Sequence, residues 1–148
     1  MPKFGKKSLS LLEQVHPDLQ KVLNLAIQLT DFSILESTIR TVEQQKQFVK
    51  EGKSKTMNSK HLKKYIPEYE KEYACAVDII HYFSKEPHLD WSDREEFTLL
   101  AGVVLGIAKM LYDKGEIKHQ IRWGGNWGIG NRIKDNSFVD MPHFEIQD

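Results

Sequence analysis

The chain has 148 residues, 40% of them hydrophobic and 28% charged, which is enough length and apolar content for one domain with a single core, residues 1–148. Its 21 basic and 21 acidic residues balance, which argues against a protein that binds nucleic acid or an anionic membrane over a broad surface. No segment approaches the roughly 18 apolar residues of a membrane span, and no secretory signal peptide is recognisable, so we expect a chain that stays in the cytoplasm where it is made unless another agent lets it out.

The first third of the chain predicts helices and a short strand. Residues 8–30 carry apolar side chains at helical spacing, with a break or second start at His16 and the proline after it. Residues 32–37 have the composition of a short strand. Residues 42–50 predict a polar helix that ends before Gly52, a common helix stop signal. We expect these helices to be scaffold.

The middle of the chain is more irregular. Residues 53–64 predict a basic loop, and residues 65–73, rich in tyrosine and charge without a clean period, predict a surface excursion. Residues 74–80 are small and branched, as in a strand. Alternation in that strand places Asp78 and Cys75 on opposite faces. We therefore expect Cys75 to be a small buried residue and not a ligand, and as the only cysteine it excludes an intrachain disulfide.

The next part predicts a long helix, a strand and a loop. A capping box at residues 92–95 opens the helix. Residues 117–123 predict a strand that leads into residues 124–130, a loop rich in glycine and tryptophan that suits the lining of a groove. Trp123 and Trp127 are candidates for the floor of that groove, although aromatic residues more often belong to the core.

The stretch 139–146 holds the most chemistry, because two carboxylates and an imidazole lie within six residues. Pro142 lacks an N–H, so this is either an edge strand or the first residues of a strand, and Asp140 belongs to the turn that leads in. The turn matters, because a fully extended chain would place residues 140 and 143 on opposite faces. We interpret His143 as a zinc ligand and Asp140 as the carboxylate that handles the proton, although a lone histidine in a strand is more often only packed or hydrogen-bonded.

A hydrolytic zinc site needs three protein ligands and one open position. His61, Asp78 and His143 would supply two imidazoles and one carboxylate from different parts of the chain. The helix-borne His-Glu-x-x-His motif is absent, which excludes a protease of that type. Spacing alone leaves the ligand set open.

Three motifs in the right order carry a resemblance to a known family. Ser59-Lys60-His61, Ala76-Val77-Asp78 and Asp140-Met141-Pro142-His143 resemble the Ser-x-His, Ala-x-Asp and (Asp/Glu)-x-x-His signature of the LAS zinc peptidases, the D-alanyl-D-alanine carboxypeptidase type. Ile39-Arg40-Thr41 and the segment 122–127 resemble more narrowly the L-alanyl-D-glutamate endopeptidases of bacteriophage endolysins. The match covers nearly the whole chain.

The resemblance implies an α+β fold of the Hedgehog/DD-peptidase-like kind, in which a small, mainly antiparallel sheet carries a zinc site and packs against helices. It implies that His61, Asp78 and His143 bind Zn²⁺, that Asp140 is the general base and then the acid, and that Arg40 holds the substrate or its oxyanion. The implied activity is a zinc-dependent peptidoglycan endopeptidase that cuts the L-alanyl-D-glutamate bond of the stem peptide, acting as a phage endolysin in host cell lysis.

One departure from the family pattern concerns the third ligand. The family usually places the first histidine and the aspartate seven residues apart, whereas His61 and Asp78 are seventeen apart, so residues 63–73 resemble an insertion. The insertion carries three glutamates that could reach a metal, at positions 68, 70 and 72. We prefer Asp78, because its Ala-x-Asp context and strand placement match. The inserted tyrosines are either a lid over the substrate or part of a solvated loop.

Several roles stay open at this point. Ser59 either orients His61 or touches substrate, or is an ordinary loop hydroxyl; we expect it, with Trp123 and Trp127, on the substrate side. Glu145 is either a partner that fixes His143 or a surface charge. Five lysines, at positions 53, 55, 60, 63 and 64, either favour an anionic cell envelope or form a solvated basic loop.

The expected partner is the peptidoglycan stem peptide, with no nucleic acid and no stable membrane insertion, and the expected state is a monomer. A D-alanyl-D-alanine carboxypeptidase on the same fold and a non-catalytic zinc-binding domain that recognises the wall are the alternatives.

Overall fold

The computed structural model describes residues 2–127 and 139–148. Its helices are α1 (Lys6–Leu12), α2 (Pro17–Leu29), α3 (Val42–Lys50) and α4 (Arg94–Asp113), with short 3-10 turns at Glu36–Thr38 and Pro67–Tyr69. Its strands are β1 (Phe32–Ile34), β2 (Lys64–Ile66), β3 (Lys71–Tyr73), β4 (Ala76–His81), β5 (Ile121–Trp123) and β6 (His143–Ile146). Among the described residues, no helix is both long and apolar enough to cross a membrane.

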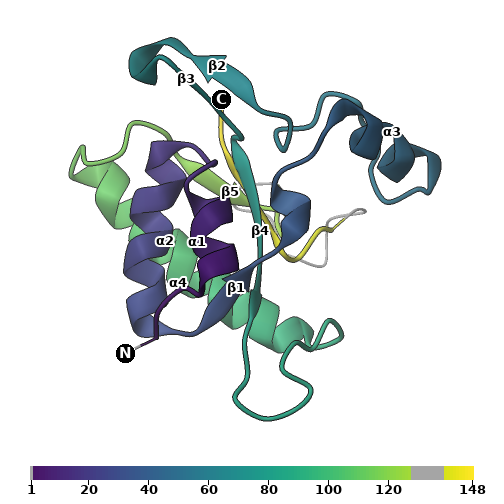
Figure 1. Ribbon diagram of the computed structural model, residues 1–148. Coiled ribbons are helices and arrows are strands. Elements are labelled where there is room, and N and C mark those ends of the chain that lie inside the picture. The colour runs from purple at the N-terminus through teal and green to yellow at the C-terminus, as the bar shows by residue number, and fades with distance from the viewer. Residues whose placement is uncertain (1, 128–138) are drawn as a thin grey trace.

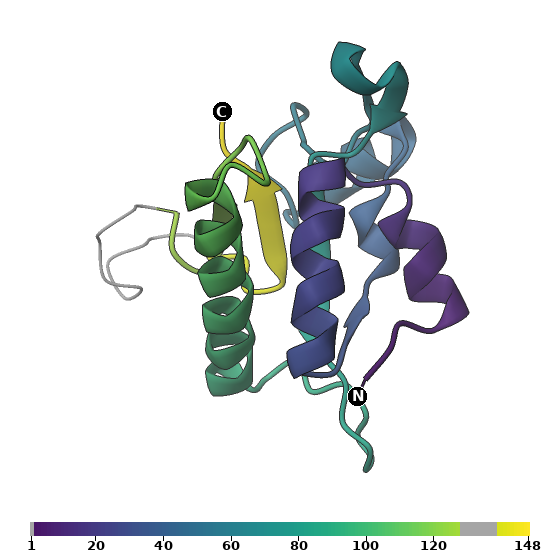
Figure 2. The ribbon, with the colours of Figure 1, turned by 90° about the vertical axis from the view of Figure 1, so that its left-hand side faces the viewer.

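The main sheet has four strands in the order β1-β4-β6-β5, and every neighbouring pair is antiparallel. Helices α1, α2 and α4 lie on one side of this sheet, and α3 stands apart on the other side (Figure 1). Turned by 90°, the molecule shows α2 and α4 side by side in front of the sheet (Figure 2). The predicted α+β class with a small, mainly antiparallel sheet is confirmed.

The hydrophobic core fills the space between the sheet and the helices α2 and α4. Alternation along β6 decides what faces it: Phe144 and Ile146 belong to the core, whereas His143 and Glu145 line a pocket on the other face. In β4, Val77 and Ile79 belong to the core. The sheet thus separates a hydrophobic face from a face that presents polar side chains.

Most helix boundaries follow from local sequence. The break predicted at His16 is confirmed: its ring accepts a hydrogen bond from the N–H of Asp18 and caps α2, with proline at the first helical position. The helix predicted over residues 42–50 is confirmed, and Gly52 after it has a φ of +77°. The start of α4 differs from prediction by one residue, because Asp93 and not Ser92 is the cap, accepting from the N–H of Glu96.

The strands are placed differently from two expectations. β6 lies between β4 and β5, so the prediction of an edge strand for residues 139–146 is wrong. The alternative, a proline at the start of a strand, holds, because Pro142 directly precedes β6. The strand predicted over residues 117–123 is shorter, because only its last three residues pair with β6. The backbone before them is held instead by Asp18, whose carboxylate accepts from the N–H groups of residues 118 and 119.

The inserted segment 63–73 forms a hairpin and not an irregular loop. β2 and β3 pair antiparallel across the 3-10 turn between them, and the hairpin projects from the body of the molecule near the C-terminus (Figure 1). Its turn is held to the body by an ion pair between Glu68 and Lys118 and by an edge contact between Tyr69 and His16.

Candidate metal centre

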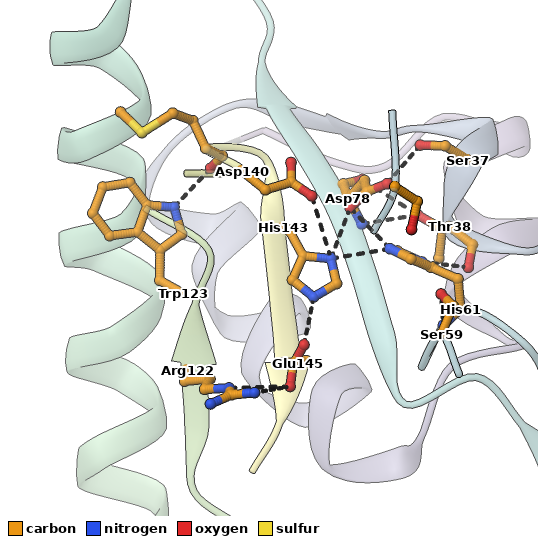
Figure 3. Close-up of polar contacts among 12 residues, drawn as sticks. Ser37, Thr38, Ser59, His61, Asp78, Arg122, Trp123, Asp140, His143 and Glu145 are labelled. Carbon is orange, nitrogen blue, oxygen red and sulfur yellow. Dashed lines mark hydrogen bonds and ion pairs between the residues drawn. The ribbon is translucent and has the colours of Figure 1, made fainter. Parts of the chain in front are cut away.

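Two imidazoles and one carboxylate converge on the polar face of the sheet. Asp78 in β4 lies directly opposite His143 in β6, and His61 reaches the same point from the loop before β2 (Figure 3). Oδ1 of Asp78 lies 3.2 Å from Nε2 of His61 and 3.3 Å from Nδ1 of His143, and the two ring nitrogens are 3.0 Å apart. All three residues are buried, with exposed fractions of 2–6%. The structure therefore brings together the three residues that the sequence indicated as ligands.

The outer nitrogen of each ring is held by an acceptor. Nδ1 of His61 lies 2.9 Å from the carbonyl oxygen of Thr38, and Nε2 of His143 lies 2.8 Å from Oε1 of Glu145. A carbonyl or carboxylate oxygen can only accept, so both outer nitrogens carry hydrogens. In the neutral rings the inner nitrogens then carry lone pairs, as in metal-binding histidines.

The carboxylate is held in the same way. Oδ2 of Asp78 accepts a hydrogen bond from the hydroxyl of Ser37 at 2.6 Å and one from Arg40 at 3.3 Å. Oδ1, which points at the two rings, is buried and has no hydrogen-bond partner within the described residues. These three atoms can all act as acceptors and face each other in a buried space, so they repel one another unless a proton or a metal cation lies among them. The cluster therefore fits a divalent metal, and the donor set of two nitrogens and one oxygen suits zinc.

The electrostatics of the cluster also favour positive charge. Burial would lower the pKa of His143, but its contacts with Asp78 and Glu145 outweigh burial and raise the pKa to about 9. Burial would raise the pKa of both carboxyls, yet the histidines hold the pKa of Asp78 well below its usual range. For Glu145, the bond from His143 and the charges of Lys60 and Arg122 lower the pKa to about 2. Both carboxylates are thus ionised beside the rings.

Asp140 stands beside the cluster without joining it. Its Oδ2 lies 4.0 Å from Nδ1 of His143, and its side chain is 38% exposed. Burial raises the pKa of Asp140, and the negative charge of Asp78 adds to the shift. Gly124 holds this turn from both sides: its carbonyl accepts from the N–H of Asp140 at 2.8 Å, and its N–H donates to the carbonyl of His143 at 2.7 Å. The arrangement suits a carboxylate that exchanges protons at the mouth of the site.

Arg40 contacts the cluster through the carboxylate of Asp78. Its guanidinium donates to the carbonyl of Ser37, to Oε1 of Gln45 and to Asp78, at 2.8, 3.0 and 3.3 Å. Three of its five N–H groups are thus used, and two have no partner among the described residues. Arg40 also lines the pocket that contains His61 and His143, so it both holds Asp78 and presents positive charge to the pocket.

This pocket, of about 400 Å³, also receives two of the three residues expected on the substrate side. Ser59 lines it, and its hydroxyl accepts from the N–H of His61 at 3.1 Å. Trp127 lines it too, with its ring 5.3 Å from that of His143. Trp123 does not: it is only 4% exposed, belongs to the core, and donates its indole N–H to the carbonyl of Met141. Residues 128–130 of the predicted groove loop lie outside the described residues.

Sequence reasoning missed some residues that complete the site. The main-chain carbonyl of Thr38 and the hydroxyl of Ser37 belong to no motif, and Gln45 is a fully buried residue on a helix that looks solvated in sequence. The alternative left open for Glu145 is decided: it contacts His143 and is 6% exposed. A fully polar residue in an otherwise strand-like run is the signal that could have pointed to Glu145.

The glutamates of the inserted hairpin do not reach the cluster. None of residues 63–73 lines the pocket, and Glu68 pairs with Lys118. The lid interpretation of this segment has no support in the described contacts.

A second group of metal-type side chains, His16, Asp18 and His119, lies beneath the hairpin. Its atoms already have protein partners. Oδ2 of Asp18 accepts from the ring and the backbone N–H of His119, and Nδ1 of His16 accepts from the N–H of Asp18. This group is a structural tie between the start of α2 and the segment before β5.

Comparisons with known proteins place the chain among peptidases. The family model of the phage L-alanyl-D-glutamate peptidases matches residues 1–147. The chain is 31% identical, over 153 aligned residues, to the L-alanyl-D-glutamate peptidase of Escherichia phage T5, covering 97% of both proteins. It is also similar to the crystal structure of the Serratia marcescens L-Ala D-Glu endopeptidase ChiX, with a TM-score of 0.71, 27% identity, and coverage of 97% of this chain and 89% of that one.

Proposed function

The chain belongs to the phage L-alanyl-D-glutamate peptidase family, and we propose that it is a zinc-dependent endopeptidase that cleaves the bond between L-alanine and D-glutamate in peptidoglycan stem peptides. The observation that carries the proposal is the convergence of His61, Asp78 and His143 on one point, with Asp140 beside it. The names of its relatives indicate which peptide bond is cut. The two nitrogen donors and one oxygen donor indicate zinc as the metal.

When bound, a zinc ion supplies a Lewis acid that polarises the scissile carbonyl and lowers the pKa of water towards neutrality. The chain's own residues handle the proton. Asp140 accepts a proton from the attacking water at its exposed carboxylate and passes it to the departing amine of D-glutamate. Its raised pKa strengthens it as a base.

Arg40 contributes fixed positive charge. Its bonds to Ser37, Gln45 and Asp78 keep the guanidinium in one orientation. Its two other N–H groups, which have no partner among the described residues, are available to the oxyanion that develops on the scissile carbonyl. Charge that is already oriented stabilises a transition state more than charge that must reorganise. Glu145 acts through His143, by holding the ring so that its inner nitrogen points towards His61 and Asp78, where it would bind the metal.

The biological role that follows is lysis of the bacterial host by a phage endolysin. The substrate is then the peptidoglycan of the host wall. We expect a monomer, because one chain supplies all the proposed ligands and the proton-handling carboxylate.

The decisive experiment is a digest of purified peptidoglycan, with identification of the new amino termini. New D-glutamate amines support the proposal, and free D-alanine would support the D-alanyl-D-alanine carboxypeptidase instead. Asp140→Asn should bind zinc like the wild type and release no fragments. Intact wall after treatment with zinc-loaded wild type would favour a domain that only binds the wall.

A further inference from the structure

One wall of the pocket is a basic loop, residues 53–58, that the proposed chemistry does not use. Lys53, Lys55 and Asn58 line the same pocket as His61 and Asp140. Lys60 lines it too, whereas the other two lysines of the basic stretch, Lys63 and Lys64, do not. The structure therefore divides the lysines that the sequence grouped together into a pocket set and an outer set.

The loop is held in place by a buried glutamine. Gln45 is 0% exposed, and its amide donates to the hydroxyl of Ser54 at 2.8 Å and to the carbonyl of Thr56 at 2.7 Å. Its carbonyl accepts from Arg40, which in turn contacts Asp78. The N–H groups of Lys53 and Ser54 both donate to the carbonyl of residue 48. The loop is thus an ordered wall of the site, connected to the proposed ligand Asp78 by partly buried hydrogen bonds through Gln45 and Arg40.

The charges on the pocket lining are unequal. Glu145 is matched by Arg122 and Lys60, which contact its carboxylate at 2.9 and 3.2 Å. Among the described residues that line the pocket, Lys53 and Lys55 add two positive charges and Asp140 adds one carboxylate. Lys53 also lies 3.2 Å from Glu51, but that pair is exposed and Glu51 does not line the pocket, so it screens the charge only weakly. A metal ion would add further positive charge.

We propose that Lys53 and Lys55 bind the free carboxylate of the glutamyl residue that follows the scissile bond. This inference rests on the proposed function. A glutamyl residue has two carboxyl groups and uses only one to continue the chain, so the other remains as an anion on the residue whose amine forms the bond that is cut. The two lysines then select a stem peptide whose glutamate is unmodified over one in which that carboxylate has become an amide.

The test compares two proteins on two substrates. The proteins are the zinc-loaded wild type and Lys53→Glu/Lys55→Glu, and the substrates are a synthetic stem peptide containing L-Ala-D-Glu and its twin with an amide in place of the free glutamyl carboxylate. Amidation should lower kcat/KM of the wild type about tenfold, mainly through KM, and should not lower that of the double variant. The double variant should also lose about tenfold on the unmodified peptide, with a smaller loss at high ionic strength.

The matched control is Lys63→Glu/Lys64→Glu, the same charge reversal on the outer set. It should respond to amidation like the wild type. The inference is overturned if amidation affects the pocket variant and the wild type equally, or if the outer variant loses as much as the pocket variant. A wild type that cleaves neither peptide would instead overturn the proposed function itself, and this inference with it.

Discussion

Asp78 and His143 stand directly opposite each other on two neighbouring antiparallel strands, with Oδ1 and Nδ1 3.3 Å apart. The register is kept by the next pair along the ladder, Val77 and Phe144, which is buried in the core on the other face. A slip by one residue would turn every side chain of β6 to the opposite face. The hydrophobic core therefore fixes two of the three proposed ligands relative to each other.

Zinc should stabilise the folded protein through these residues. A ligand that binds only the folded state at a hundred times its Kd adds about 2.7 kcal/mol to the free energy of unfolding. Asp78→Asn should lose most of this gain, because it removes the charge that attracts the cation. Denaturant unfolding of chelator-treated protein, with and without zinc, measures the stabilisation of the wild type and its loss in Asp78→Asn. Asp113→Asn, an exposed change at the end of α4, is the control, and an equal zinc effect in both variants would contradict the ligand assignment.

Glu145→Gln should weaken zinc binding about 10–100-fold, because the carboxylate that orients the ring and raises its basicity is lost. A competition titration against a chromophoric chelator measures the affinity. Since Glu145 also pairs with Arg122, Arg122→Met is the informative comparison: it removes that pair and leaves the contact with His143. If both variants bound zinc equally weakly, the effect would belong to the ion pair and not to the orientation of His143.

Gly124→Ala should displace Asp140. A Cβ built at Gly124 would lie 2.3 Å from the main-chain oxygen of Asp140, so the turn must move. We expect a loss in kcat of about a hundredfold, since a shift of about 1 Å in a catalytic group has effects of this size. Zinc content should stay unchanged. Gly102→Ala on α4, where nothing lies within 4 Å, should keep full activity and gain about 0.4–1 kcal/mol of stability. Full activity of Gly124→Ala would argue against Asp140 as the proton carrier.

The stability of the protein should fall as the pH drops below about 6.5 because of His16. Burial lowers the pKa of this ring, against the opposing charge of Asp18 and with a further small lowering from His119. The unfolded chain then takes up a proton near 6.5 while the folded chain does not, so protons favour unfolding.

His16→Asn isolates this effect, because asparagine can still accept from the N–H of Asp18 as the cap of α2. We expect the free energy of unfolding of the wild type to fall more steeply than that of the variant between about pH 7.5 and 5.5. Two parallel curves would show that His16 is not kept neutral by burial. Glu68 and Lys64 also act on this ring, so both proteins should be compared at the same ionic strength.

The sequence predicted those features that depend on near neighbours in the chain. The helix over residues 42–50 and the break at His16 follow from caps and proline, which act within one turn. The strand predicted over residues 117–123 is longer than β5, because hydrophobic alternation does not show which backbone N–H groups will bond to a distant side chain. Here the N–H groups of residues 118 and 119 bond to the carboxylate of Asp18. The hairpin of residues 63–73 was missed because its strands are mostly exposed and show no alternation of burial.

The amino-acid sequence by itself determined the chemistry that this protein carries: two histidines, two aspartates and an arginine in an order that resembles one peptidase family. Only the tertiary structure decided which atoms of those residues meet, that Trp123 belongs to the core while Trp127 faces the pocket, and that Glu145, Gln45 and the basic loop complete the site. The physical reason is that the contacts which build the site join residues far apart in the chain. Motifs record residue types, whereas convergence depends on strand register and buried hydrogen bonds between segments far apart in the chain, which form only when the core closes.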